Sequence, residues 1–306
     1  MREAGLFLFE AKAMLDLLIP TVAQGLLWAL MALGVYITFR VLDIADLSVE
    51  GTFPLGAAVA STVLASGYGI GTAFIFAAVA GALAGVITAL LTTKLKIPAL
   101  LAGILTMIGL YSINLHVMGK ANVSLLRVDT VFSFVRDWGL TDAQATFIVG
   151  LVAVILVGCA IYWFFGTELG TSIRATGFNP QMARAQGINT DTMVILGLLI
   201  SNLLVALSGA LVAQSNGFAD VGMGTGTIVI GLASVIIGEV LFGTRSFKNC
   251  LIAVILGSIV YRLVIAVVLQ LGMPPNDLKL FTAVLVAVAL SMPMLKGKLK
   301  LRRIVK

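Results

Sequence analysis

The sequence has few charged residues and no long polar stretch. Among its 306 residues, 20 are Lys or Arg and 14 are Asp or Glu, so charged residues make up 11%. Soluble domains carry about 25% charged residues, whereas hydrophobic residues reach 60% in this chain. The composition therefore excludes a soluble globular protein and predicts an all-α chain that crosses a membrane several times.

Residue types that form cross-links, metal sites or nucleotide sites are also scarce. Cys159 and Cys250 lie in separate apolar runs and His116 is the single histidine, so neither a disulfide framework nor a metal site is indicated. The chain has no glycine-rich P-loop ending in Lys and Ser or Thr, which excludes ATP binding of that kind. No arrangement of nucleophile and base indicates an enzyme, and no cofactor is expected in this chain.

The net charge of +6 has one source, the carboxyl-terminal tail. Residues 296–306 include six basic residues and no acid. Because the tail directly follows an apolar run, retention in the cytoplasm explains it better than nucleic-acid binding. The first 16 residues have mixed charges and no cleavage site for a signal peptide. We expect them to form a short amphipathic segment on the membrane surface.

About nine apolar runs are long enough, or nearly so, to cross a bilayer. They span about 17–39, 52–66, 69–93, 97–118, 145–165, 193–215, 225–241, 250–270 and 278–295. The second and the seventh are short and rich in small residues, which is typical of half-helices or of tightly packed interior helices.

The basic residues outside these runs predict the orientation of the chain. Those at 94–96, in the central loop 166–192, at 242–249 and in the tail all fall on one side of the membrane when the runs cross it in turn. The positive-inside rule makes that side the cytoplasm. The segment 119–144 and the amino end are then outside.

Two parts of the sequence resemble each other. Residues 44–46 (Ile-Ala-Asp) match 218–220 (Phe-Ala-Asp), and the runs that precede them align without gaps. We therefore predict that 17–118 and 193–294 are two copies of one four-segment unit, with a linking span at 145–165. Because five crossings separate the starts of the copies, the copies must be inverted, an arrangement typical of alternating-access transporters.

In each copy, the first span ends in a polar break that a short helix of small residues follows. The first break contains Asp46, Glu50 and Thr52, and the second contains Asp220 and Thr227. Such matched breaks indicate a transport site, because their free backbone groups must be satisfied by water, protein or substrate. Two interpretations stay open. These residues line the substrate pathway, or the carboxylates cap helices and pair with a neighbouring arginine.

Other polar residues in or near the spans have simpler interpretations. Arg40 is the arginine expected to pair with the carboxylates of the first break, and Glu239 is expected to pair with Arg245. Asn202 is expected to form a hydrogen bond between helices rather than to bind a ligand.

The central loop 166–192 carries charged residues, interior glycines and a proline, so it cannot lie in lipid. Asn179 suits an N-cap, Pro180 suits the first helical position and Gly187 suits the end of a helix, which together predict a short helix. This helix is either a solvated connector or a docking helix for a soluble partner.

The pattern Arg-Ala-x-Gly-x-Asn at 174–179, followed by Ala183 and by Gly-Ile-Asn at 187–189, resembles the cytoplasmic loop of permease subunits of bacterial ABC importers. The resemblance is to the branched-chain amino-acid/ribose-type permease family, in which this loop touches the ATPase. It implies that these residues couple the chain to an ATPase: Arg174, Gly177, Asn179, Pro180, Ala183, Arg184 and Gly187.

The resemblance extends over about 17–295 and implies an assembly in the bacterial inner membrane. It implies two permease copies, either a homodimer or two different chains, together with two ATPase subunits that hold ATP and Mg and an extracytoplasmic substrate-binding protein. The runs 45–52 and 98–106 look like those of permeases for tryptophan-type amino-acid uptake. The implied function is import of a small solute, an amino acid of aromatic type.

An ion-coupled secondary transporter is the alternative function. It would also show inverted repeats and broken helices. Because it needs no ATPase, co-purification of an ATPase with the chain distinguishes the two functions.

Overall fold

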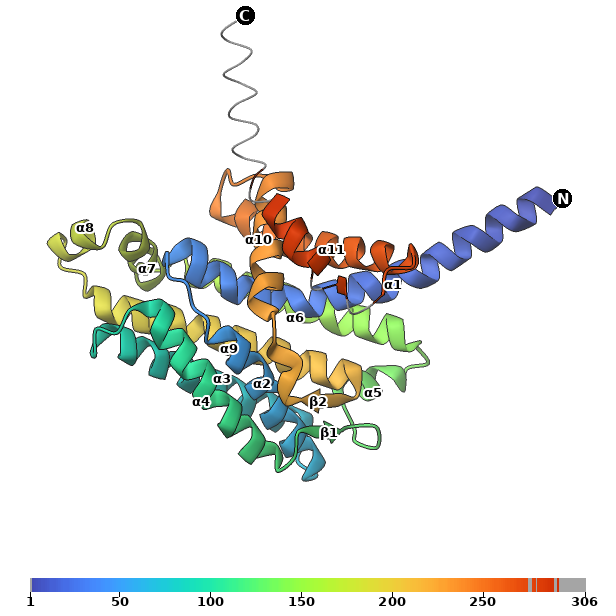
Figure 1. Ribbon diagram of the computed structural model, residues 1–306, viewed down its shortest axis with the longest axis horizontal. Helices are drawn as coiled ribbons and strands as arrows, with labels where there is room; N and C mark the ends of the chain where they lie inside the picture. Colours follow the sequence, from blue (N-terminus) through green and yellow to red (C-terminus); the bar gives the residue numbers. More distant parts are fainter. Residues whose placement is uncertain (1, 275–276, 279, 289–290, 292–306) are drawn as a thin grey trace, which may run out of the picture.

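The structure is a computed structural model that describes residues 2–274, 277–278, 280–288 and 291, with side chains from residue 18 onward. It is almost entirely helical, which confirms the all-α prediction (Figure 1). Its elements are, in chain order, α1 (Arg2–Tyr36), η1 (Ile37–Val41), α2 (Val49–Ala65), α3 (Ile70–Thr93), α4 (Ala99–Met118), β1 (Asn122–Ser124), α5 (Val131–Arg136), α6 (Asp142–Phe164), α7 (Glu168–Phe178), α8 (Pro180–Ala185), α9 (Thr190–Asn216), β2 (Phe218–Asp220), η2 (Val221–Gly224), α10 (Thr227–Phe242) and α11 (Phe247–Gln270).

The helices match the apolar runs of the sequence closely. Within the described residues, seven helices are long and apolar enough to cross a membrane, and α2 is a shorter apolar helix, as predicted. The ninth run, 278–295, is helical over 280–288 and otherwise lies largely outside the described residues. At the amino end, residues 2–16 form no separate segment. They continue into the first span as one helix, which Figure 1 shows extending beyond the bundle.

Small residues let the helices approach one another backbone to backbone. A Cβ added to Gly56 on α2 would lie 1.9 Å from the carbonyl oxygen of Ala206 on α9. Where α1 crosses α9, Ser201 donates a hydrogen bond to the Gly34 carbonyl at 2.7 Å and Ser208 donates one to the Leu27 carbonyl at 2.8 Å. Membrane helices associate through such close packing and interhelical hydrogen bonds, because lipid is as apolar as their side chains.

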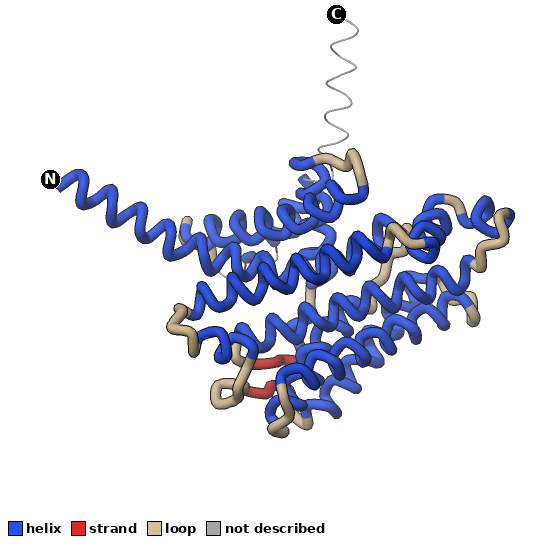
Figure 2. Tube along the Cα trace, turned by 180° about the vertical axis from the view of Figure 1, so that it is seen from behind, coloured by secondary structure: helices blue, strands red, loops and turns tan. Residues whose placement is uncertain are grey.

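The two ends of the bundle differ in structure. At one end, β1 from the 119–144 segment pairs with β2 of the second break, antiparallel, with Val123 opposite Ala219. Figure 2 shows this ribbon on the far side of the bundle from α7 and α8.

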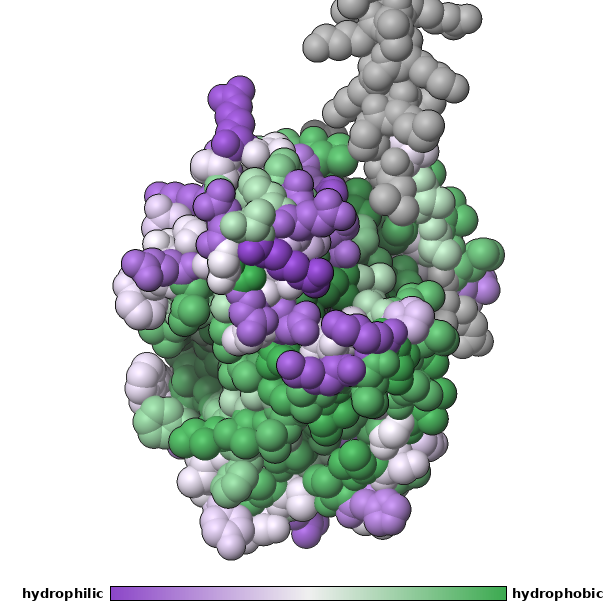
Figure 3. Space-filling model, turned by 90° about the vertical axis from the view of Figure 1, so that its left-hand side faces the viewer, coloured by the Kyte–Doolittle hydropathy of each residue, from purple (hydrophilic) through white to green (hydrophobic). Residues whose placement is uncertain are grey.

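The other end carries the basic residues. Lys96, after α3, lies 3.7 Å from Asp191 at the start of α9. Arg174 of α7 and Arg245 before α11 line one cavity there. Figure 3 shows hydrophilic residues gathered over part of this end of an otherwise apolar surface. Three of the four basic clusters thus share one end, and the tail 296–306 lies outside the described residues.

Candidate functional site

The two helix breaks predicted from the sequence contact each other. The backbone N–H of Gly226, which precedes α10, donates to Oε1 of Glu50 at 3.1 Å. A Cβ added to Gly224 would lie 2.0 Å from the carbonyl oxygen of Glu50, so only glycine fits there. Glu50 is in the first turn of α2. The carboxylate of one break therefore caps the helix that follows the other break.

A buried polar network fixes the first break to α9. Asp46 is only 3% exposed and accepts hydrogen bonds from the backbone N–H and hydroxyl of Ser48 and from Nδ2 of Asn202. The hydroxyl of Thr52 donates to Oδ1 of Asn202 at 2.7 Å. Asn202 therefore joins α9 to both sides of the break, in the interhelical role expected for it.

The second break is organised by its own side chains. Asp220 Oδ1 accepts from the backbone N–H of Gly222 at 2.7 Å and caps η2. Thr227 is 1% exposed, and its hydroxyl donates to the carbonyl of Gly224 at 2.8 Å. In this conformation Asp46, Thr52 and Thr227 are enclosed by protein, and Glu50 and Asp220 are half-buried.

Arg40 forms a different ion pair from the one expected. It pairs with Glu239, which lies in the last turn of α10, rather than with a carboxylate of the first break. Glu239 is correspondingly not paired with Arg245. The reason is tertiary, because η1 brings Arg40 against the end of α10, while Asp46 is already satisfied by Ser48 and Asn202.

The short helix predicted in the central loop is confirmed as α8. The side chain of Asn179 accepts from the Met182 backbone N–H at 3.0 Å, Pro180 is the first helical residue, and Gly187 has φ +82°. The predicted surface of α8 needs correction, because Ala183 is fully buried and cannot offer its side chain to a partner. Arg184 donates from Nε to the Thr190 hydroxyl at 2.8 Å and so holds α8 to α9.

A second helix in this loop, α7, was not predicted. Glycines Gly170 and Gly177 within it are positions of close packing. A Cβ on Gly170 would lie 2.4 Å from the Cα of Phe165, and one on Gly177 would lie 1.8 Å from the Val41 carbonyl oxygen. Gly177 therefore lets α7 pack closely against η1. Just beyond this contact, Phe178 is 89% exposed.

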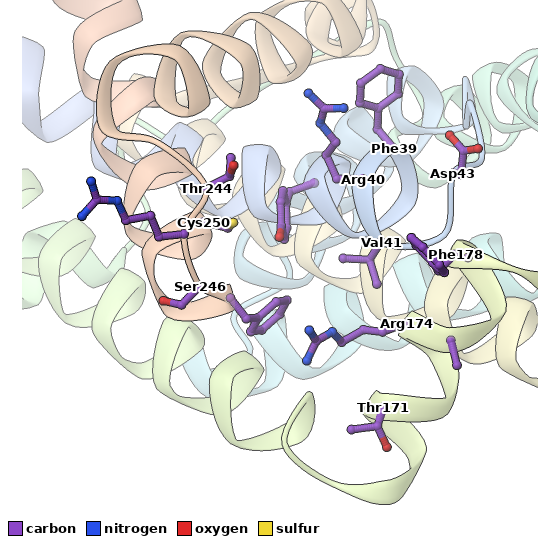
Figure 4. Close-up of a pocket in the computed structure, with 15 residues that line it drawn as sticks. Phe39, Arg40, Val41, Asp43, Thr171, Arg174, Phe178, Thr244, Ser246 and Cys250 are labelled. Atoms are coloured by element: carbon purple, nitrogen blue, oxygen red, sulfur yellow. The ribbon is translucent and has the colours of Figure 1, made fainter.

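A cavity of about 890 Å³ opens between η1, α7 and the start of α11 (Figure 4). Arg40, Asp43 and Arg174 lie around it, and the guanidinium of Arg174 lies 5.0 Å from the ring centroid of Phe247. The cavity is thus on the same end as α8, close to the surface on which a soluble partner would dock.

Arg262 is a charged residue inside a span and was not predicted as a site residue. It lies within α11, in the apolar run 250–270, and its guanidinium lies 4.2 Å from the ring centroid of Trp28. The signal was available in the sequence, because an ionisable residue inside a membrane span is costly and is normally kept for a function.

Comparisons with known proteins identify relatives along nearly the whole chain. A family model described as the branched-chain amino acid transport system permease component matches residues 17–290. A tyrosine transport system permease protein of Clostridioides difficile (strain R20291) is 40% identical over 92% of this chain and 93% of the relative. An uncharacterized protein of Rickettsia prowazekii (strain Madrid E) is 35% identical over 90% of this chain and 98% of its own length.

More distant matches include an autoinducer 2 import system permease protein of Yersinia pseudotuberculosis, which is 29% identical over 80% of this chain and 68% of the relative. Among solved structures, a metal-chelate type ABC transporter in an inward-facing conformation gives a TM-score of 0.48. It is 14% identical, and the match covers 92% of this chain and 85% of that chain.

Two broken helices that meet inside a bundle of membrane spans define a class, the transport permeases. The family match then makes the assignment specific: the chain belongs to the branched-chain amino acid transport system permease family. It is the membrane-spanning permease component of an ABC importer. It is not itself an enzyme, because ATP hydrolysis in such a system belongs to ATPase subunits, which work with the permease and a substrate-binding protein.

Proposed function

We propose that this permease imports an aromatic amino acid and that two copies of it form the pathway, in the bacterial inner membrane. The relative named a tyrosine transport permease supports this substrate class, because it is 40% identical over almost the full length of both chains. The runs 45–52 and 98–106, which look like those of tryptophan-type uptake permeases, agree with it.

The observation that carries the coupling part of the proposal is the capped helix α8. Its buried Ala183 and the bond from Arg184 to Thr190 fix it to the bundle, while its outer side remains open. Phe178 and Met182 are 89% and 45% exposed. A helix of six residues is marginal in isolation, so the bundle and an ATPase bound to this outer side would together stabilise it.

The inverted repeat of 17–118 and 193–294 belongs to the same proposal. The alignment that places 32–34 over 206–208 also places Leu27 over Ser201 and Gly34 over Ser208. The repeat therefore maps the hydrogen-bonded pair Ser201–Gly34 onto the positions of the other pair, Leu27–Ser208. This supports a pseudo-two-fold axis through the crossing of α1 and α9. The pathway residues that we propose lie at the breaks on either side of it: Asp46, Glu50, Thr52, Asp220 and Thr227.

The test is reconstitution of the purified assembly into vesicles that contain ATP. We expect uptake of labelled tyrosine or tryptophan that depends on the binding protein and on an ATPase that co-purifies with the chain. Uptake by the chain alone, driven by an ion gradient, would establish a secondary transporter instead. ATP-driven uptake restricted to aliphatic amino acids would contradict the aromatic substrate class and leave the importer assignment intact.

A further inference from the structure

Arg262 places a cation deep in a membrane span. At a rise of 1.5 Å per residue, it lies roughly 22 Å from Phe247 and roughly 12 Å from Gln270 along α11. The neighbouring turns are apolar or small, and Ser258 donates to the Gly25 carbonyl of α1 at 2.7 Å. The arginine is therefore held at a close crossing of α1 and α11, away from both helix ends.

The chain provides an aromatic partner for Arg262 but no counterion among the side chains described, which begin at residue 18. Its guanidinium lies 4.2 Å from the ring centroid of Trp28, and Trp28 in turn lies 5.0 Å from the ring of Phe53 on α2. Its Nε is buried without a hydrogen-bond partner, and none of the ion pairs in the described part of the chain includes it.

The side chains outside the description offer few candidates for a counterion. They belong to residues 1–17, 275–276, 279, 289–290 and 292–306, and their Asp and Glu residues are Glu3, Glu10 and Asp16. The nearest carboxylate on α1 in sequence, that of Asp16, is twelve residues from Trp28, or about 18 Å along a helix.

A positive charge at this depth cannot face hydrocarbon without a large cost. The cation–π contact with Trp28 compensates only part of that cost. Arg262 is not fully buried, so part of its side chain reaches the surface of the chain. The exposed part of Arg262 must therefore contact water, protein or an anion. Of these, a carboxylate suits a guanidinium best, because it accepts two parallel hydrogen bonds from it.

We infer that Arg262, stacked on Trp28, is a carboxylate-binding site in the transport pathway. It takes the carboxylate of the transported solute, while Trp28 and Phe53 hold the guanidinium in place and connect the site to α2. The inference rests on the proposed import of an amino acid and names the group that recognises its anionic end.

The test uses the assembled transporter in vesicles, with binding protein saturated with tyrosine. We expect Arg262→Gln to lower ATP-driven tyrosine uptake at least tenfold and Arg262→Lys to restore part of it. Arg127→Gln, which changes an exposed arginine outside the spans, should leave uptake unchanged. Normal uptake by Arg262→Gln would overturn the inference. Failure of the wild type to transport any aromatic amino acid would count against the proposed function instead.

A second measurement does not depend on transport or on the native arginine. In a background with Cys159→Ser and Cys250→Ser, Arg262→Cys should react with a water-soluble methanethiosulfonate reagent that carries a sulfonate. No reaction would place residue 262 against lipid or packed protein. That result would overturn the inference.

Discussion

At the scale of single residues, the two breaks depend on a few buried polar side chains. Asn202 binds Asp46 with its amide N–H and accepts from Thr52, so one side chain holds the first break to α9. A buried carboxylate that loses its donor retains its desolvation penalty. These contacts should therefore dominate the local stability of the breaks.

Asn202→Leu should reduce the stability of the solubilised chain by about 1–3 kcal/mol, because it leaves Asp46 and Thr52 without their shared partner. Thermal unfolding followed by fluorescence and size exclusion measures the loss. Asn216→Leu, at an exposed position near the end of the same helix, α9, is the matched control and should change the midpoint little. Equal effects of the two substitutions would show that the buried network makes no specific contribution to stability.

Two substitutions of Glu50 distinguish its role as a helix cap from any role of its negative charge. Glu50→Gln keeps an oxygen acceptor for the Gly226 N–H, whereas Glu50→Ala removes it. We expect the alanine variant to lose about 0.5–2 kcal/mol of stability, as for other helix caps. The glutamine variant should stay close to wild type in stability. If Glu50 also lines the pathway, the glutamine variant should lose uptake. Wild-type uptake and stability in both variants would exclude both roles.

At the scale of elements, local signals were sufficient for α8 and insufficient for α7. The cap of α8 and its proline lie within its own sequence, so the helix was predicted from residues 179–187 alone. In α7, the meaning of Gly177 depends on Val41, which is remote in sequence, and propensity alone assigns a glycine there to a loop. The pairing of Arg40 with Glu239 and the contact between the breaks are likewise properties of the folded bundle.

The docking prediction concerns the exposed residues at the end of α7 and on α8. Phe178→Asp should leave stability within about 0.5 kcal/mol of wild type, because the ring is exposed, yet it should reduce co-purification of the ATPase and substrate-stimulated ATP hydrolysis. Arg184→Glu should weaken docking and also disturb the bond to Thr190. Leu126→Asp, at a residue that is 85% exposed in the turn after β1, is the matched control. Equal loss of ATPase from Phe178→Asp and Leu126→Asp would refute a specific docking surface at the end of α7 and on α8.

Ala183→Trp tests the packing of α8 instead of its surface. Because Ala183 is 0% exposed, the indole cannot be accommodated without displacing α8 from its packed position. We expect loss of about 1–3 kcal/mol of stability, as for overpacked cores, measured by thermal unfolding of the chain without its partner. A variant as stable as wild type would show that α8 moves freely.

At the scale of the whole molecule, the distribution of charge predicts the orientation in the membrane. In intact cells, Lys96→Cys and Arg245→Cys should be shielded from impermeant thiol reagents, whereas Arg127→Cys, near the β1–β2 end, should react. Permeabilised cells provide the control for reactivity of the shielded positions. Labelling of Arg245→Cys from outside would contradict both the orientation and the inverted repeat.

The bond between Asn202 and Asp46 also affects the order in which the two halves of the protein can be inserted into the membrane. Asn202 is synthesised 156 residues after Asp46. At 5–20 residues per second, roughly 8–30 s separate the two on the ribosome. During that interval Asp46 has its local donors on Ser48 but lacks Asn202, so one oxygen of a carboxylate that is buried in the folded chain has no donor from α9. We therefore expect α2 to be inserted incompletely at that stage. A nascent chain arrested before α9 should therefore keep α2 open to protease, and insertion of the first half is complete only when the second half arrives.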